Sequence, residues 1–117
     1  MTTLVGGTQG FLDGTASIAQ FEMSIQSVID TSGNIFVSDR NNFRIRRVDW
    51  FTRNVTTVAG NGVGKELDGV GSSAQFNGPM GLIISNGSIW VADTPGGTVR
   101  HIGMMNIRFK YYTFLNQ

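Results

Sequence analysis

Two stretches of the chain carry nearly the same pattern, IFVSDRNNFRIRRVD at residues 35–49 and IWVADTPGGTVRHIG at residues 89–103. Each begins with an apolar segment that ends in Asp, and each continues through a short polar segment into a second segment that contains Arg. The likeness extends outward, because AQF occurs at both 19–21 and 74–76. The offset is 54 residues for the first pair and 55 for the second. A period of this length predicts a repeat architecture of the propeller or solenoid kind.

Within each copy the sequence predicts an antiparallel meander of short strands. DTSGN in the first copy and SNGS in the second separate the first two strands and have the Asn and Gly chemistry of hairpins. Apolar and polar residues alternate poorly in GLIIS and IWVAD, which is typical of a sheet covered on both faces. The predicted strands are residues 24–29, 35–39, 44–49 and 54–59 in the first copy, and 81–85, 89–93 and 98–103 in the second.

The composition favours a mostly β domain and names no partner by charge. The 117 residues suit a single domain, and 16 Gly with 15% charged residues favour many short strands. A formal net charge of +1 gives no field that would steer the protein onto nucleic acid or an anionic membrane. No cysteine is present, which excludes a thiolate metal site and leaves the compartment open. No apolar run reaches the ~18 residues of a membrane-spanning helix, so we expect no membrane insertion.

The repeat resembles a known family. Residues 55–102 contain, in order, TVAG, DG, AQF, PMG, VAD and RHI, which is similar to the long form of the NHL repeat. Residues 3–49 resemble a second copy, with MSI in place of PMG. After residue 103 the tail does not return to TVAG. The ordered string of motifs is more specific than any one of them.

The resemblance implies an all-β fold of two four-stranded antiparallel blades of the NHL type, which form part of a six-bladed propeller. Blade 1 then covers about residues 8–59 and blade 2 about residues 60–114, within one partial propeller of residues 1–117. Residues 1–7, which contain TTLVGG, become a strand of an adjacent blade. Two blades cannot close a ring, so we expect self-association or other chain segments to complete it. Three copies of the chain would supply six blades, and a head-to-tail contact that closes by rotation allows a cyclic trimer.

The outer faces of an isolated blade pair are predicted to be apolar. Exposed apolar patches of several hundred Å² mark interaction surfaces. The sequence therefore predicts a non-catalytic protein-interaction or scaffold module that assembles with other copies or within a larger assembly. The residues expected on these faces include Ile25, Val28, Phe36, Leu82, Ile84 and Trp90.

Basic and aromatic residues suggest a second kind of binding surface. Several arginines crowd into a short segment with aromatic residues between them, which is the combination that single-stranded RNA binding uses. The R-x-I-R pattern also belongs to the ordinary repeat signature, so we favour blade-edge charges or a protein contact over RNA. The candidate binding residues are Arg40, Arg44, Arg46, Arg47, Trp50, Arg53, Arg100 and His101.

Repeated acidic residues are interpreted as structural. An Asp at the end of a strand more often accepts backbone N–H groups in an Asx turn than binds a cation, and DG pairs are turn punctuation. The predicted structural turn residues are Asp13, Gly14, Asp39, Asp68, Gly69 and Asp93.

Catalytic chemistry has little support in the sequence. The single histidine, His101, aligns with Arg47 in the other copy, which indicates a variable surface position. No nucleophile elbow, HExxH pair or phosphate-binding loop occurs. We therefore predict no catalytic residue, no metal ligand and no cofactor, and the metal-dependent propeller lyases and hydrolases related to this family are the enzymatic alternative.

Overall fold

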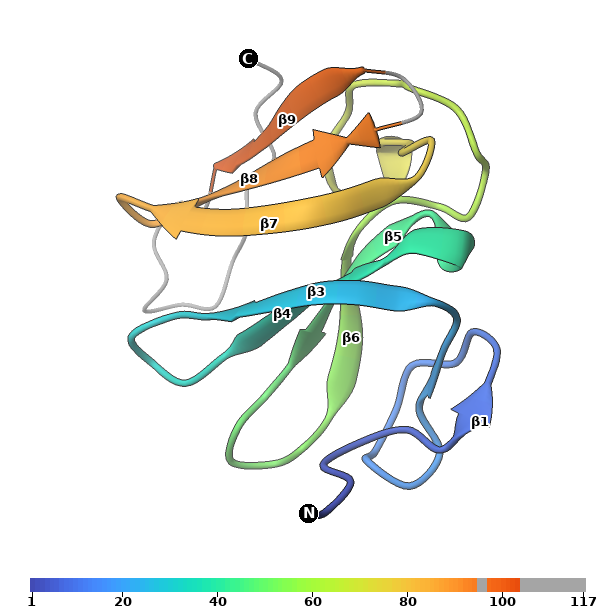
Figure 1. Ribbon diagram of the computed structural model, residues 1–117, viewed down its shortest axis with the longest axis vertical. Helices are drawn as coiled ribbons and strands as arrows, with labels where there is room; N and C mark the ends of the chain where they lie inside the picture. Colours follow the sequence, from blue (N-terminus) through green and yellow to red (C-terminus); the bar gives the residue numbers. More distant parts are fainter. Residues whose placement is uncertain (95–96, 104–117) are drawn as a thin grey trace.

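The computed structural model describes residues 1–94 and 97–103, which fold into small β-sheets without an α-helix among them (Figure 1). A small parallel pair, β1 and β2, precedes two larger sheets of four and three strands. The strands are β1 (Thr8–Gln9), β2 (Gln20–Phe21), β3 (Ser24–Ile29), β4 (Ile35–Asp39), β5 (Arg44–Val48), β6 (Val55–Ala59), β7 (Pro79–Ser85), β8 (Ser88–Asp93) and β9 (Thr98–Gly103). Single 3-10 turns, η1 (Arg40–Asn42) and η2 (Gly71–Ser73), complete the described elements.

The predicted meanders are present in sequential strand order, β3-β4-β5-β6 and β7-β8-β9. The bounds of β3, β4 and β9 agree with the sequence, whereas β7 begins two residues earlier than predicted, at Pro79. Residues 1–7 form no strand within this chain. Residues 104–114, the remainder of the predicted blade 2, lie outside the described residues.

The register of the two larger sheets repeats. The pair Val28↔Phe36 has its counterpart in Ile83↔Trp90, which sets an offset of 55 for the first strand and 54 for the second. The offset changes because the second hairpin is one residue shorter. Its two turn residues, Asn86 and Gly87, have φ of 51° and 74°, as a type I′ turn requires.

The two larger sheets pack face to face, with β3 and β4 of the first against β7 of the second (Figure 1). Successive side chains of a strand point to opposite faces, so each sheet has two faces with separate residue sets. We call one the leading face, formed by Val28, Phe36, Ser38 and Ile45 in the first sheet and by their counterparts Ile83, Trp90, Ala92 and Val99 in the second. The opposite, trailing face is formed by Ser27, Ile29, Ile35, Val37 and Val48 in the first sheet and by Leu82, Ile84, Ile89, Val91 and Ile102 in the second.

The main core lies where the leading face of the first sheet meets the trailing face of the second. Phe36 and Leu82, expected on outer faces, are 0% and 1% exposed there, so that prediction is wrong for both. The reason is that each sheet buries one face against the other, and these residues lie on the buried faces. Val28 and Ile84 pack against the same core, whereas the outward position is correct for the exposed Ile25 and Trp90.

Two polar contacts fix the seam between the sheets. The side chain of Gln26 accepts the backbone N–H of Leu82 at 2.6 Å. The hydroxyl of Ser38 donates to the carbonyl of Met80. On the leading side of the second sheet these positions are occupied by Gly81 and Ala92, which carry no hydrogen-bonding side chain.

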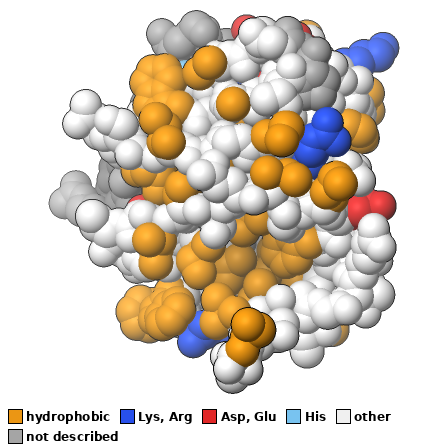
Figure 2. Space-filling view, in the orientation of Figure 1, with side chains coloured by type: hydrophobic (Ala, Val, Ile, Leu, Met, Phe, Trp, Pro, Cys, Tyr) orange, Lys and Arg blue, Asp and Glu red, His pale blue; other side chains and the backbone are white. Residues whose placement is uncertain are grey.

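The trailing face of the first sheet is only partly covered. A second apolar cluster forms there, where Val5 and Phe21, which precede the first sheet in the chain, pack against Val48 and Val55. Beside it lies an open hollow of about 400 Å³, and Figure 2 shows apolar side chains gathered in a hollow in the lower half of the molecule. The lining includes Leu4, Val5, Phe21, Ile25, Ile35, Val37 and Val48.

Candidate functional site

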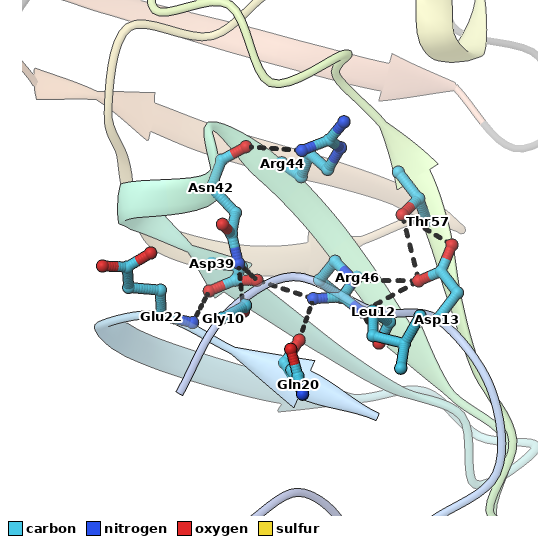
Figure 3. Close-up of polar contacts among 10 residues, drawn as sticks. All are labelled: Gly10, Leu12, Asp13, Gln20, Glu22, Asp39, Asn42, Arg44, Arg46 and Thr57. Atoms are coloured by element: carbon cyan, nitrogen blue, oxygen red, sulfur yellow. Dashed lines mark hydrogen bonds and ion pairs between the residues drawn. The ribbon is translucent and has the colours of Figure 1, made fainter. Parts of the chain in front are cut away.

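The guanidinium of Arg46 lies at the centre of a buried polar network under the first sheet (Figure 3). It pairs with Asp39 at 2.7 Å and with Asp13 at 2.8 Å, and the side chains of Arg46 and Asp39 are both 0% exposed. Its N–H groups also donate to the carbonyls of Leu12 and Gln20 at 2.9 and 2.8 Å. Burying a charge is tolerable only when it is paired and hydrogen-bonded, and this network meets that condition.

The second sheet contains the same network at the repeat spacing. Arg100 pairs with Asp93 at 3.1 Å and with Asp68 at 3.2 Å, and it donates to the carbonyls of Leu67 and Gln75. Each partner is the counterpart, 54 or 55 residues on, of a partner of Arg46. The repeated Asp and Arg of the motif are therefore explained by one clasp in each sheet.

The strand-end aspartates accept backbone N–H groups from distant residues. Asp39 accepts the N–H of Glu22 at 2.8 Å, and Asp93 accepts the N–H groups of Asn77 and Gly78. These donors precede the aspartates by 15 to 17 residues, so the contacts tie the loop to the sheet and are not local Asx turns.

The predicted DG turns are also corrected. The backbone forms no turn at Asp13 or Asp68, and both carboxylates pair with the arginines of the clasps. Gly14 forms an antiparallel bridge to Val55 at the edge of the first sheet. Gly69 passes so close to the backbone of Ser73 that a Cβ would lie 2.7 Å from it.

The arginines near β5 do not form one surface. Arg46 is buried, so it cannot contact a partner directly, and its assignment to a binding surface is wrong. Arg44 lies at the start of the strand, with its guanidinium 3.7 Å from the centre of the Phe11 ring. Burial, followed by the charge of Arg46, lowers the pKa of Arg44 from its ordinary value. Arg40 lies in η1, and its guanidinium reaches the neighbouring Asn41 at 3.5 Å.

The other predicted basic and aromatic residues lie at the far end of β5. Arg47 pairs with Asp49 at 3.2 Å, and Arg53 lies over the half-exposed ring of Trp50 at 4.3 Å. The carboxylate of Asp49 accepts the N–H groups of the turn that follows. The hydrogen bond from Thr52 is the largest cause that lowers the pKa of Asp49, and the charge of Arg47 acts in the same direction. These contacts stabilise the hairpin between β5 and β6 and do not line a common pocket.

His101 belongs to the leading face of the second sheet. Its ring lies 4.4 Å from that of Trp90, its cross-strand neighbour. Arg100, adjacent in sequence, points to the opposite face and into the clasp. Within residues 1–94 and 97–103 no three His, Asp or Glu side chains are grouped so that they could hold a metal ion. The same residues contain no helix long and apolar enough to cross a membrane.

Two apolar surfaces of the sheets are exposed among the described residues. On the leading face of the second sheet, Ile83, Trp90 and Val99 are 60%, 37% and 67% exposed. The other is the hollow on the trailing face of the first sheet. Phe36 and Trp90 are equivalent in the sequence, so only the stacking of the sheets shows that Trp90 is the exposed one, and the hollow depends on the way Val5 and Phe21 fold back.

Comparison with known proteins finds longer relatives, while no protein-family model matches the chain. The chain is 32% identical over 93 residues to Protein SUPPRESSOR OF QUENCHING 1, chloroplastic, of Arabidopsis thaliana. That alignment covers 79% of this chain and 9% of the plant protein, so the chain spans less than a tenth of this relative.

Two solved structures from Bacteroides thetaiotaomicron are similar in fold. One, a protein of unknown function, has a TM-score of 0.78 and 27% identity over 83% of this chain. The other, whose description assigns it provisionally as a phosphatase, has a TM-score of 0.76 and 25% identity over 89%. The chain spans 26% of each of these structures.

Proposed function

We propose that this chain is a non-catalytic protein-interaction module made of two NHL-type propeller blades, which assembles with other copies or chains. One observation carries the proposal: the exposed leading face of the second sheet is apolar at the same positions as the leading face that the first sheet buries. Val28, Phe36 and Ile45 are replaced there by other apolar residues and not by charged ones.

The exposed leading face of the second sheet resembles an interface more than the outer face of a terminal repeat unit. Terminal units of repeat proteins usually present a polar outer face, because nothing covers them. Here Ile83, Trp90 and Val99 gather around Ala92 and Gly81 in an apolar depression. A contiguous surface of this kind in water favours association.

The stacking mode supports a propeller. Leading face meets trailing face, so a further sheet added in the same manner again leaves one face of each kind free. Such head-to-tail contacts generate a ring when the rotation closes. The motif order in the sequence supports the same interpretation.

Native mass spectrometry of the full chain tests the module. We expect wild type to form assemblies larger than one chain, and Trp90→Glu to reduce their size, because a carboxylate on the leading face must be desolvated on association. Trp50→Glu is the matched control, since Trp50 is 45% exposed but lies on neither free face. A wild-type monomer whose mass and solubility are unaffected by Trp90→Glu would overturn the proposal.

A further inference from the structure

The N-terminal segment repeats the sequence of the last strand of the first sheet. TTLVGG at residues 2–7 aligns with TTVAGN at residues 56–61 at an offset of 54. In the first sheet β6 pairs along β5, with Val48 opposite Val55 and Ile45 opposite Ala59. The second sheet has β9 in the place of β5, and no fourth strand pairs with it among the described residues.

The backbone after the segment also repeats. Gly6 and Gly60 have φ of 85° and 99°, a region that glycine adopts without strain. The N–H of Gly6 donates to the carbonyl of Ala16, and the N–H of Gly60 donates to the carbonyl of Gly71, its counterpart at an offset of 55. The backbone after residues 1–5 therefore has the same conformation and the same hydrogen bond as the backbone after β6.

The segment also lies where a fourth strand of a preceding sheet would lie. Val58 and Ala59 of β6 pack in the main core with Phe76 and Ile102 of the second sheet. Val5, the counterpart of Ala59, packs with Phe21 and Val48, the counterparts of Phe76 and Ile102. The N-terminal segment thus already rests on the trailing face of the first sheet, without a sheet of its own.

The geometry points to a second copy of this chain as the partner: residues 2–5 of one copy pair with β9 of the next as its fourth strand. The leading face of the second sheet in the copy that accepts the strand then covers the hollow on the trailing face of the first sheet in the copy that donates it. The contact between the two sheets within one chain supplies the template. There β6 is the fourth strand of the first sheet, and the leading face of that sheet covers the trailing face of the second sheet. This inference rests on the proposed function and adds the partner, its orientation and its register.

The template also assigns a hydrogen bond to the pairing. Thr57 of β6 donates its hydroxyl to Asp13 at 3.0 Å, beside the clasp of the first sheet. The counterparts are Thr3 and Asp68, and the Asp68 side chain is 62% exposed, against 40% for Asp13. Thr3 of one copy would therefore donate to Asp68 of the next.

Complementary variants test the orientation. Leu4→Asp damages the donating end and leaves the second sheet intact, whereas Trp90→Asp damages the accepting face and leaves the N-terminal end intact. We expect each variant alone to be monomeric by native mass spectrometry, and an equimolar mixture to give a heterodimer that grows no further. If wild type assembles and the mixture does not pair, association is not head to tail and this inference fails while the interaction module stands. If wild type is a monomer at every concentration, self-pairing is refuted.

Threonine and cysteine variants test the register. Thr3→Val should weaken association about tenfold, because a hydrogen bond to a carboxylate is lost, and Thr2→Val should not. Thr2 and His101 are the counterparts of the neighbours Thr56 and Arg47, so a mixture of Thr2→Cys and His101→Cys chains should oxidise to a covalent dimer. Thr3→Cys with His101→Cys should not, because Thr3 points to the other face. Equal yields, or assemblies unchanged by deletion of residues 1–5, would refute the pairing of residues 2–5 with β9.

Discussion

Replacement of Arg46 by alanine should remove a large part of the stability of the fold. The substitution leaves the fully buried carboxylate of Asp39 without its ion-pair partner, and it strips donors from the carbonyls of Leu12 and Gln20. Breaking a buried pair by removing one partner costs about 3–5 kcal/mol. Domains of this size have total stabilities of about 5–15 kcal/mol, so the variant should be close to unfolding.

The assay is urea unfolding followed by circular dichroism, in a Trp90→Glu background so that assembly does not add to the apparent stability. Arg100→Ala is the matched comparison. The side chain of Arg100 is 10% exposed, against 0% for Arg46, and its partner Asp68 is 62% exposed and can be hydrated, so the loss should be smaller, about 2 kcal/mol. The Arg46→Met and Asp39→Asn pair should cost less together than the sum of the single changes. A loss for Arg46→Ala below about 1 kcal/mol would refute the clasp as a stabilising element.

Three further changes test other parts of the seam and hairpin by the same unfolding assay. Phe36→Ala should cost about 3–5 kcal/mol because it opens a cavity between the sheets, whereas Ile25→Ala, at an exposed site, should cost little. Gln26→Ala should cost about 1–3 kcal/mol, because it leaves the N–H of Leu82 without its acceptor. Gln26→Glu keeps an acceptor and should cost less than Gln26→Ala. Asp49 has a lowered pKa in the folded state, so its contribution is present above the ordinary value of 3.8 and is lost as the pH falls through the folded pKa. The stability difference between wild type and Asp49→Asn should therefore shrink below about pH 4, and a constant difference would contradict this assignment.

The sequence predicts the strands well because their signals are local. Turn residues such as Asn86-Gly87 and the apolar runs beside them determine where strands end, and the repeat supplies each boundary twice. Strand pairing in chain order follows from short hairpins. The all-β class and the meander are therefore readable from one chain.

The candidate site is less readable because it depends on contacts between distant residues. Arg46 and Arg47 are adjacent and identical in type, yet one is buried in the clasp and the other pairs at the edge of the hairpin. The alternation of β5 decides between them, and the carboxylate of Asp13 comes from a loop that precedes it by more than 30 residues. Phe36 and Trp90 are equivalent in the repeat, and only the stacking of the sheets determines that one is buried and the other exposed.

In the second sheet, Gly81 and Ala92 occupy the positions that Gln26 and Ser38 have in the first. The seam within one chain and a seam between two copies are therefore chemically unequal. The inner seam has directional bonds and a covalent connection through the loop, so it opens only when the chain unfolds. A seam between copies would depend on apolar area, strand pairing and the hydrogen bond from Thr3 to Asp68, and subunits mixed from separately labelled preparations should exchange while every inner seam stays closed. The molecule would then behave as an indivisible unit of two sheets, and any ring built from it could be dismantled by dilution and rebuilt by concentration.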